Sequence, residues 1–148
     1  MNIDIQYATI ALEKAVGASC SKSQLLRWIR ASSPAHSILT IRFVNRAEIQ
    51  KLNRNYRGKM YSPNVLTFNY KNRSSQIEAD IILCWPVLKA EAKLQNKSIF
   101  AHLAHLLIHG CLHAQGFDHE NRRDAKKMED LEIQLLSKFG FTNPYFIL

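Results

Sequence analysis

Cysteine, proline and glycine are scarce in this sequence, which contains three, four and five of them among 148 residues. Cys20, Cys84 and Cys111 form an odd set without the spacing of a disulfide framework, as expected of a reduced intracellular protein. No internal repeat, low-complexity tract or Pro/Gly/Ser-rich linker divides the chain. These absences predict one domain over residues 1–148 and a cytoplasmic location.

Long uncharged stretches are also rare, and residues 99–117 form the only one that resembles a membrane span. That stretch holds histidine, glutamine and glycine, which are costly in lipid, so it predicts a buried central helix instead. Asp4 stands where a secretory signal would carry basic residues, and no small-residue cleavage site follows an apolar run. We therefore expect no targeting segment and no membrane partner.

Acidic residues are outnumbered, with 12 Asp and Glu against 20 Lys and Arg, which gives a net charge of +8. Such an excess indicates a polyanionic partner, although a solvated basic surface that serves solubility has the same composition. Apolar residues make up 47% and charged residues 22%, which is ordinary for a globular protein and excludes a disordered one.

Short apolar or alternating segments predict four strands, and helical periodicity predicts five helices. The strands are expected at residues 2–7, 37–44, 64–70 and 79–84, and the helices at 21–31, 47–56, 87–94, 98–115 and 122–139. Ser21 and Ser98 are predicted N-caps, and Pro86 stands just ahead of a helix. The interleaved order predicts an α/β (α+β) fold with a small four-stranded mixed sheet.

The most informative helix begins at Ser98 and carries His102, His105, His109 and His113 on one face. Positions four apart are separated by about 6 Å of rise and about 40° of rotation, so two such histidines can bind one ion. Zn–N bonds are only about 2.0–2.1 Å long, so three histidines spread over eight positions cannot all reach one zinc. A third ligand has to come from a segment that turns back.

Gly116 supplies that turn, because glycine readily adopts the left-handed conformation that ends a helix. His119 can then approach His109 and His113, which gives the ligand spacing H-x3-H-x2-G-x2-H. Three neutral imidazoles suit zinc, and the fourth position is left for water, as in catalytic sites. The spacing predicts one zinc ion per chain, held at the end of the central helix by His109, His113 and His119, and no organic cofactor.

The residue after the first ligand separates two kinds of hydrolase. In H-E-x-x-H enzymes this residue is the glutamate that acts as general base, whereas here it is Gly110, which disfavours a protease of that type. Hydrolysis is still feasible because zinc lowers the pKa of a bound water to about 7. Asp118 and Glu120 flank the last ligand, and each is either a carboxylate that serves the site or an ordinary surface residue.

Residues 105–120, HLLIHGCLHAQGFDHE, closely resemble the signature H-x-x-x-H-G-x-L-H-x-x-G-Y-D-H of the YbeY endoribonucleases. Upstream, residues 52–57 resemble the family's L-N-x-x-[FY]-R, residues 64–68 its D-V-L-S-F strand and residues 79–84 its G-D-I-x-[IL]-[CS] strand. The chain departs from these patterns at four positions, with asparagine for aspartate, alanine for glycine, alanine for leucine and phenylalanine for tyrosine: Asn64, Ala79, Ala114 and Phe117.

The resemblance implies a metal-dependent, single-strand endoribonuclease in ribosomal RNA processing, notably small-subunit 3′-end maturation, and in ribosome quality control. Its implied partners are ribosomal RNA and the small ribosomal subunit. It assigns zinc to the three histidines named above and RNA cleavage to Arg57, whose guanidinium suits the charge that develops on a phosphodiester oxygen. The aspartate missing at Asn64 leaves open what orients Arg57. His105 matches the first histidine of the signature and either contacts substrate, supports a ligand or is a hydrogen-bonded interior residue.

The last predicted helix carries the basic residues Arg122, Arg123, Lys126 and Lys127 beside the acidic residues Asp124, Glu129, Asp130 and Glu132. The basic group either lines an RNA groove through phosphate contacts or forms an exposed salt-bridged face with the acidic group. Cys111 and Met128 are expected to pack in the core. No aromatic platform for stacking bases stands out.

Two other functions fit the same residues. One is a zinc hydrolase of another substrate, including peptides, and Gly110 argues against the peptide version. The other is a ribosome assembly factor whose metal is structural, and the open three-histidine site argues against it.

Overall fold

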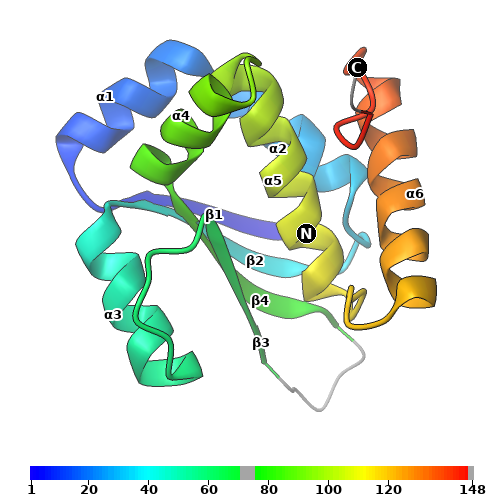
Figure 1. Cartoon of the computed structure of the whole chain (residues 1–148), viewed down its shortest axis with the longest axis horizontal. Coiled ribbons are helices and arrows are strands. Elements are labelled where there is room, and N and C mark those ends of the chain that lie inside the picture. The colour runs from blue at the N-terminus through cyan, green and yellow to red at the C-terminus, as the bar shows by residue number, and fades with distance from the viewer. Residues whose placement is uncertain (71–75, 147–148) are drawn as a thin grey trace.

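The computed structural model describes residues 1–70 and 76–146, which form a four-stranded sheet and six helices (Figure 1). The strands are β1 (Asn2–Tyr7), β2 (Ile38–Val44), β3 (Val65–Tyr70) and β4 (Glu78–Cys84). The helices are α1 (Ile10–Ser19), α2 (Lys22–Ala31), α3 (Arg46–Arg57), α4 (Trp85–Leu94), α5 (Ile99–Ala114) and α6 (Arg122–Lys138). Within the described ranges, none of these helices has the length and hydropathy needed to cross a bilayer.

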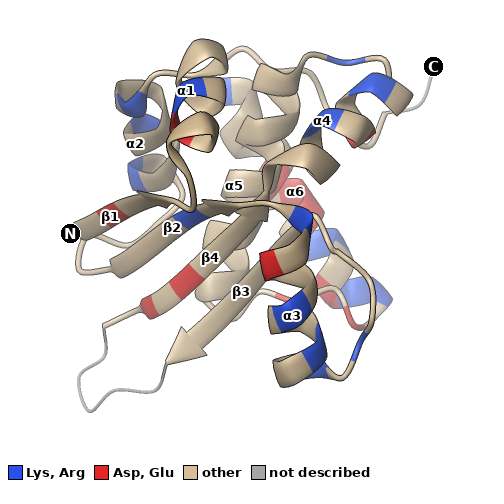
Figure 2. Cartoon of the chain, turned by 90° about the vertical axis from the view of Figure 1, so that its left-hand side faces the viewer, with Lys and Arg blue, Asp and Glu red and all other residues tan. Residues whose placement is uncertain are grey.

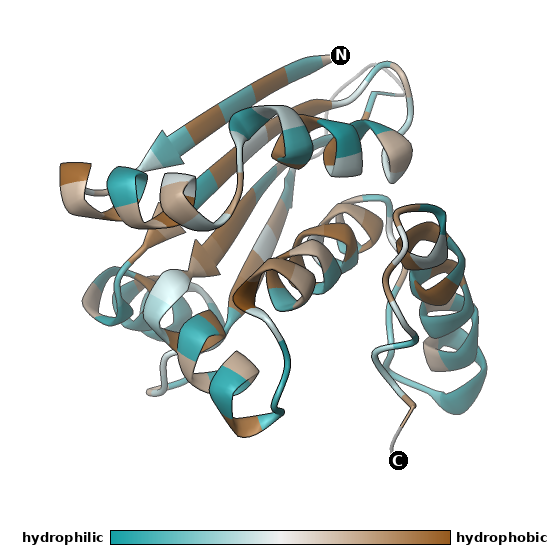
Figure 3. Ribbon diagram, turned by 90° about the horizontal axis from the view of Figure 1, so that it is seen from above, coloured by the Kyte–Doolittle hydropathy of each residue, from teal (hydrophilic) through white to brown (hydrophobic). Residues whose placement is uncertain are grey.

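The sheet is mixed, as predicted, and has the order β1-β2-β4-β3. The first three of these strands are parallel, with Ile41 paired to Ile5 on one side and to Ile81 on the other, and β3 runs antiparallel to β4. Figure 3 shows brown and teal segments alternating along the edge strand β1, the period of two that a half-buried strand requires.

All nine expected elements are present, and α1 is an additional helix that the sequence analysis did not identify. Its first turn is capped by Thr9, whose hydroxyl accepts a hydrogen bond from the Leu12 amide at 3.1 Å. Only Leu12 and Val16 of this helix are buried, while Ile10 is 73% exposed. Apolar residues therefore do not mark a single face of α1, which is the pattern by which the other helices were recognised.

The two faces of the sheet bury separate clusters. Alternate residues of β4, namely Ala79, Ile81 and Leu83, pack into the main core, whereas Ile82 and Cys84 pack into the second. Helix α3 contributes to the second core and lies across the sheet from α1 and α2 (Figure 2). The sheet is thus covered on both faces near the carboxyl ends of β2 and β4.

Helix α5 is the buried central helix that the sequence predicted, and it contacts β3, β4, α2, α4 and α6. Ser98 caps it, because its hydroxyl accepts a hydrogen bond from the Ala101 amide at 3.0 Å. Cys111 has no exposed surface and Met128 of α6 is 1% exposed, so both pack in the core as expected. The rigidly packed α5 holds two of the predicted metal ligands in its C-terminal half.

Candidate metal centre

The predicted turn after α5 forms at Gly116, whose φ is +94°. The Gly116 amide donates to the His113 carbonyl at 3.0 Å, and the Phe117 amide donates to the Leu112 carbonyl at 3.2 Å. These two bonds make a Schellman motif, and the Phe117 ring packs against the main core. The motif reverses the chain and brings His119 back beside α5.

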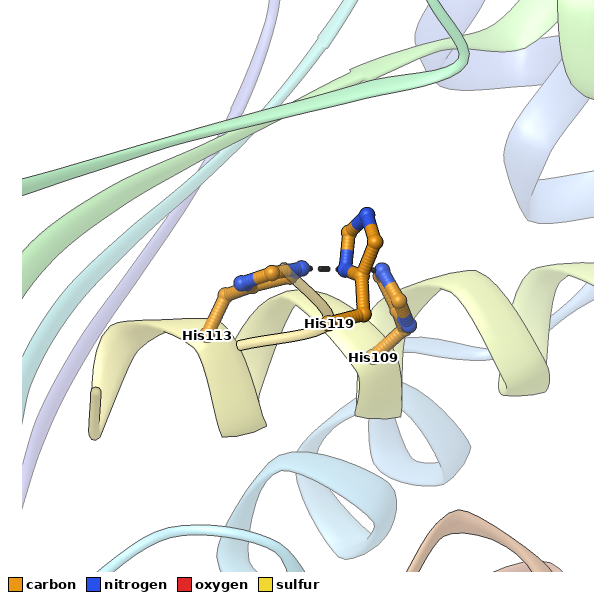
Figure 4. A group of neighbouring side chains, drawn as sticks. All are labelled: His109, His113 and His119. Atoms are coloured by element: carbon orange, nitrogen blue, oxygen red, sulfur yellow. Dashed lines mark hydrogen bonds between the residues drawn. The ribbon is translucent and has the colours of Figure 1, made fainter. Parts of the chain in front are cut away.

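Three imidazoles converge at this helix end (Figure 4). The Nε2 atoms of His109 and His113 are 3.1 Å apart, and the His119 ring centroid lies 5.1 Å from that of His113 and 5.8 Å from that of His109. One ligand nitrogen from each ring falls within 4.8 Å of the other two. Nitrogens on one tetrahedral zinc are about 3.3 Å apart, so these rings can hold a metal ion after a small rotation of the exposed His119.

His113 is suited to bind a metal because it is neutral. Burial, together with the neighbouring His109 and His119 rings, lowers the pKa of His113 from its ordinary value to about 4. A neutral imidazole keeps a free lone pair for a metal ion at pH 7. His109 and His113 are partly buried while His119 is exposed, so the cluster opens toward solvent on one side.

The open side faces a cleft of about 1020 Å³. The three histidines share its lining with residues of α3, α4, β3 and the connecting loops, including Arg57, Lys59, Tyr61, Asn64, Glu91, Asp118 and Glu120. Among the residues described, the basic side chains of the lining come from the end of α3 and the loop after it, and not from α6. Tyr61 places an aromatic ring there, 57% exposed, which the sequence analysis did not anticipate.

Arg57 is held on β3. Its Nη2 donates to the Thr67 carbonyl at 3.0 Å, and its guanidinium carbon lies 6.0 Å from the centroid of the Phe68 ring. Asn64 has a different role, because its amide donates to both carboxylate oxygens of Glu91 at 3.2 and 3.3 Å. The question left open by the missing aspartate is thus answered: Thr67 and Phe68 orient Arg57.

The other two histidines of α5 are bound to buried or half-buried carboxylates. His102 Nε2 lies 3.0 Å from Glu91 Oε1, and His105 Nε2 lies 2.8 Å from Glu132 Oε2. Of the three roles considered for His105, the structure supports the hydrogen-bonded interior residue. Asp118 is half exposed and accepts a hydrogen bond from the His119 amide at 2.7 Å, so it fixes the loop that carries the last ligand.

One of the two interpretations of the last helix, an exposed salt-bridged face that includes Glu132, is wrong for this residue. Its side chain has no exposed surface, and it lies between Met128 and Leu136 on the buried stripe of α6. Burial alone raises the pKa of Glu132, but hydrogen bonds from His105 and His109 outweigh it and lower the pKa to about 2. The signal in the sequence was the position of this carboxylate: Glu132 is four residues from an apolar residue on each side, Met128 and Leu136, and so lies on the apolar face of the helix. Elsewhere on α6, Lys126 and Asp130 do form an exposed pair at 3.5 Å.

Gly110 is required by packing. An added Cβ would lie 2.7 Å from Ile81 Cγ2 and 3.6 Å from Val65 Cγ2, and Ile81 is fully buried in β4. The helix therefore approaches the sheet too closely for any side chain at this position. A glutamate of the H-E-x-x-H kind cannot be accommodated without moving α5.

Replacing Gly110 by alanine is accordingly expected to lower the free energy of unfolding by about 1–3 kcal/mol, the usual effect of overpacking. Urea denaturation measures the change. Gly17→Ala is the matched control, since Gly17 lies in α1 with nothing within 4 Å of an added Cβ. There alanine should stabilise by about 0.5–1 kcal/mol through better helix propensity. Equal stabilisation by both substitutions would contradict the close approach.

Comparison with known proteins identifies the family and the fold. The family model described as "Endoribonuclease YbeY" matches residues 6–140. A protein of that name from Polynucleobacter asymbioticus is 54% identical over 143 residues, covering 97% of this chain and 92% of its own length. Another protein of that name, from Herminiimonas arsenicoxydans, is 45% identical over 98% of this chain and 95% of its own length. The solution structure of a Thermotoga maritima protein superposes with a TM-score of 0.56 at 20% identity, over 98% of this chain and 99% of that protein. This similarity shows that the two proteins share a fold.

Proposed function

This chain belongs to the YbeY family of endoribonucleases, and from that premise we propose that it is a zinc-dependent endoribonuclease of single-stranded ribosomal RNA. The observation that carries the proposal is the convergence of His109, His113 and His119 in one cleft with Arg57. The reaction is hydrolysis of an internal phosphodiester bond. The whole chain acts as one domain, and its site of action is the small-subunit RNA in the cytoplasm, in 3′-end maturation and quality control.

The three imidazoles supply the ligands of the zinc. When bound, zinc acidifies a water molecule and accepts charge from a phosphoryl oxygen. The helix end fixes His109 and His113 at four-residue spacing, and the Schellman turn at Gly116 fixes His119 across from them. The side of the three-histidine cluster that faces the cleft is open, so a zinc ion held by these residues would be accessible to substrate.

Arg57 lines the same cleft as the three histidines and receives the scissile phosphate. Its Nη2 donates to the Thr67 carbonyl, while its other guanidinium donors bond to no other residue that the structure describes and are available for phosphate oxygens. Because the charge on those oxygens grows as the phosphodiester is attacked, a fixed guanidinium stabilises the transition state more than the bound substrate. Lys59 adds a second positive charge to the cleft lining and favours a polyanion.

Peptide hydrolysis is disfavoured for a structural reason. The glutamate that deprotonates water in H-E-x-x-H proteases has no room at Gly110. Asp118 and Glu120 line the cleft and are the nearest carboxylates in sequence to the ligand set, but they flank its third member rather than its first.

A direct test compares identically prepared wild type, His113→Ala and Arg57→Ala on single-stranded ribosomal RNA and on casein. Wild type is expected to cut the RNA internally and leave casein intact, and its RNA affinity should fall steeply with added salt. Equal RNA cleavage by all three proteins would point to a contaminating nuclease and reject the proposal. Zinc-dependent cleavage of casein would favour a zinc hydrolase of another substrate. RNA binding without cleavage would favour a ribosome assembly factor with a structural metal.

A further inference from the structure

Glu132 is a carboxyl group with no exposed surface, and a buried group of this kind is costly unless hydrogen bonds satisfy it. Its two oxygens have three partners. Oε1 lies 2.6 Å from His109 Nδ1, while Oε2 lies 2.8 Å from His105 Nε2 and 2.5 Å from the Tyr145 hydroxyl. Each partner has a hydrogen to donate, so the carboxylate is fully engaged although it has no exposed surface.

The bond to His109 fixes the state of a proposed zinc ligand. With Glu132 Oε1 as the acceptor of this bond, His109 donates from Nδ1 and its Nε2 is the nitrogen that remains for a metal ion. That Nε2 is the atom 3.1 Å from His113 Nε2. Glu132 therefore turns the ring and selects the tautomer that faces the ligand set. Outer hydrogen bonds of this kind raise metal affinity by orienting the ligand.

His105, His109 and Glu132 also satisfy the distance requirement for a metal site of their own. Their contacts argue against a second ion. The separations of 2.6 and 2.8 Å from Glu132 are hydrogen-bond lengths, whereas two ligands on one tetrahedral zinc lie about 3.3 Å apart. The Tyr145 hydroxyl in addition occupies the second carboxylate oxygen.

The C-terminal segment completes this arrangement. After α6 the chain turns at Gly140, with φ of +82°, and runs back beside that helix (Figure 1). Phe141 anchors the segment on Trp28 and Phe100, with ring centroids 5.8 and 5.5 Å apart. Tyr145 then reaches Glu132 with its hydroxyl and packs its ring edge-on against His105 at 5.3 Å.

We infer that Glu132, itself anchored by Tyr145, is a positioning residue for the metal centre and that the C-terminal segment is part of this centre. The inference rests on the proposed zinc site. It extends that site from three histidines to a carboxylate and a tyrosine from α6 and the segment beyond it. Neither residue touches the cleft, so both act through His109.

The test measures zinc affinity of the full chain by competition with a chromophoric chelator. Glu132→Gln keeps the shape and removes the charge, and it is expected to weaken zinc binding 10- to 100-fold. Tyr145→Phe should weaken it less, by severalfold. Asp130→Asn removes an exposed carboxylate from the same helix and Tyr70→Phe removes a hydroxyl bonded to Asp80, so neither should change the affinity.

A second readout separates positioning from folding. In metal-free wild type, ¹⁵N NMR of the imidazoles should find His109 protonated on Nδ1, and in Glu132→Gln a mixture of tautomers. Wild-type affinity in a folded Glu132→Gln protein, or His109 protonated on Nε2 in wild type, would overturn the inference. If Glu132→Gln does not fold, the inference is tested by the zinc affinity of Tyr145→Phe and by the His109 tautomer of metal-free wild type. Failure of wild type to bind zinc would reject the proposed function instead, because the tautomer is measured without metal.

Discussion

His113→Ala is expected to abolish stoichiometric zinc binding and reduce RNA cleavage to background. Of the three proposed ligands, His113 lies nearest to both of the others, with ring centroids 4.6 Å from His109 and 5.1 Å from His119. Its removal leaves two histidines whose ring centroids are 5.8 Å apart, too few donors for a three-ligand site. Elemental analysis of protein purified without chelator, and cleavage of single-stranded RNA, measure the two effects.

The same substitution has a consequence for stability. A ligand that binds only the folded state stabilises it by about 2.7 kcal/mol at 100 times its dissociation constant. Zinc should therefore raise the melting temperature of wild type and leave that of His113→Ala unchanged. His36→Ala is the control, since His36 is an exposed histidine in the connection between α2 and β2. Full zinc occupancy in His113→Ala would show that His109, His113 and His119 do not form the zinc site.

Arg57→Ala is expected to lower the rate of RNA cleavage by about 10²–10³, the usual effect of removing one preorganised donor to a developing oxyanion. Zinc content should be unchanged because Arg57 binds Thr67 and Phe68 rather than a histidine. Arg57→Lys should recover little, since an ammonium cannot reproduce the two-pronged contact of a guanidinium with phosphate. Single-turnover kinetics on a defined RNA fragment measures the loss.

Arg54→Ala is the matched control for this experiment. Arg54 is exposed and lies one helical turn before Arg57 on α3, and it is absent from the cleft lining among the residues described. Its loss removes one positive charge from the same region and should weaken RNA binding only modestly. If both alanine variants cleave at the same rate, Arg57 contributes general charge and not a specific phosphate contact.

Local patterns accounted for most of the secondary structure. The strands and the five expected helices follow the periods of two and 3.6 that each element imposes on its buried face. Helix α1 was missed because its apolar residues are not confined to its buried face: Leu12 and Val16 are buried, but Ile10 is exposed. The three-histidine cluster could be predicted from the sequence for the same reason. Four-residue spacing on α5 and a glycine that ends the helix determine which rings meet, over only eleven positions of the chain from His109 to His119.

The residues that surround the three-histidine cluster could not be predicted from local patterns. Glu132 lies 23 residues from His109 and Tyr145 another 13 beyond it, so their hydrogen bonds exist only because α6 packs on α5 and the chain returns. Glu132 was expected to be exposed in one of the two interpretations of the last helix, since charge alone suggests exposure. Burial of a carboxylate is decided by the donors around it, and those come from other elements.

The sequence by itself thus determined every described element except α1, the three converging histidines and the absence of a glutamate at position 110. Only the tertiary structure decided why that glutamate is absent, what holds Arg57 and what orients His109. Spacing within a helix follows from backbone geometry that every sequence shares. Contacts between α5, α6, β3 and β4 depend instead on how side chains fill the space between them, as Gly110 does against Ile81.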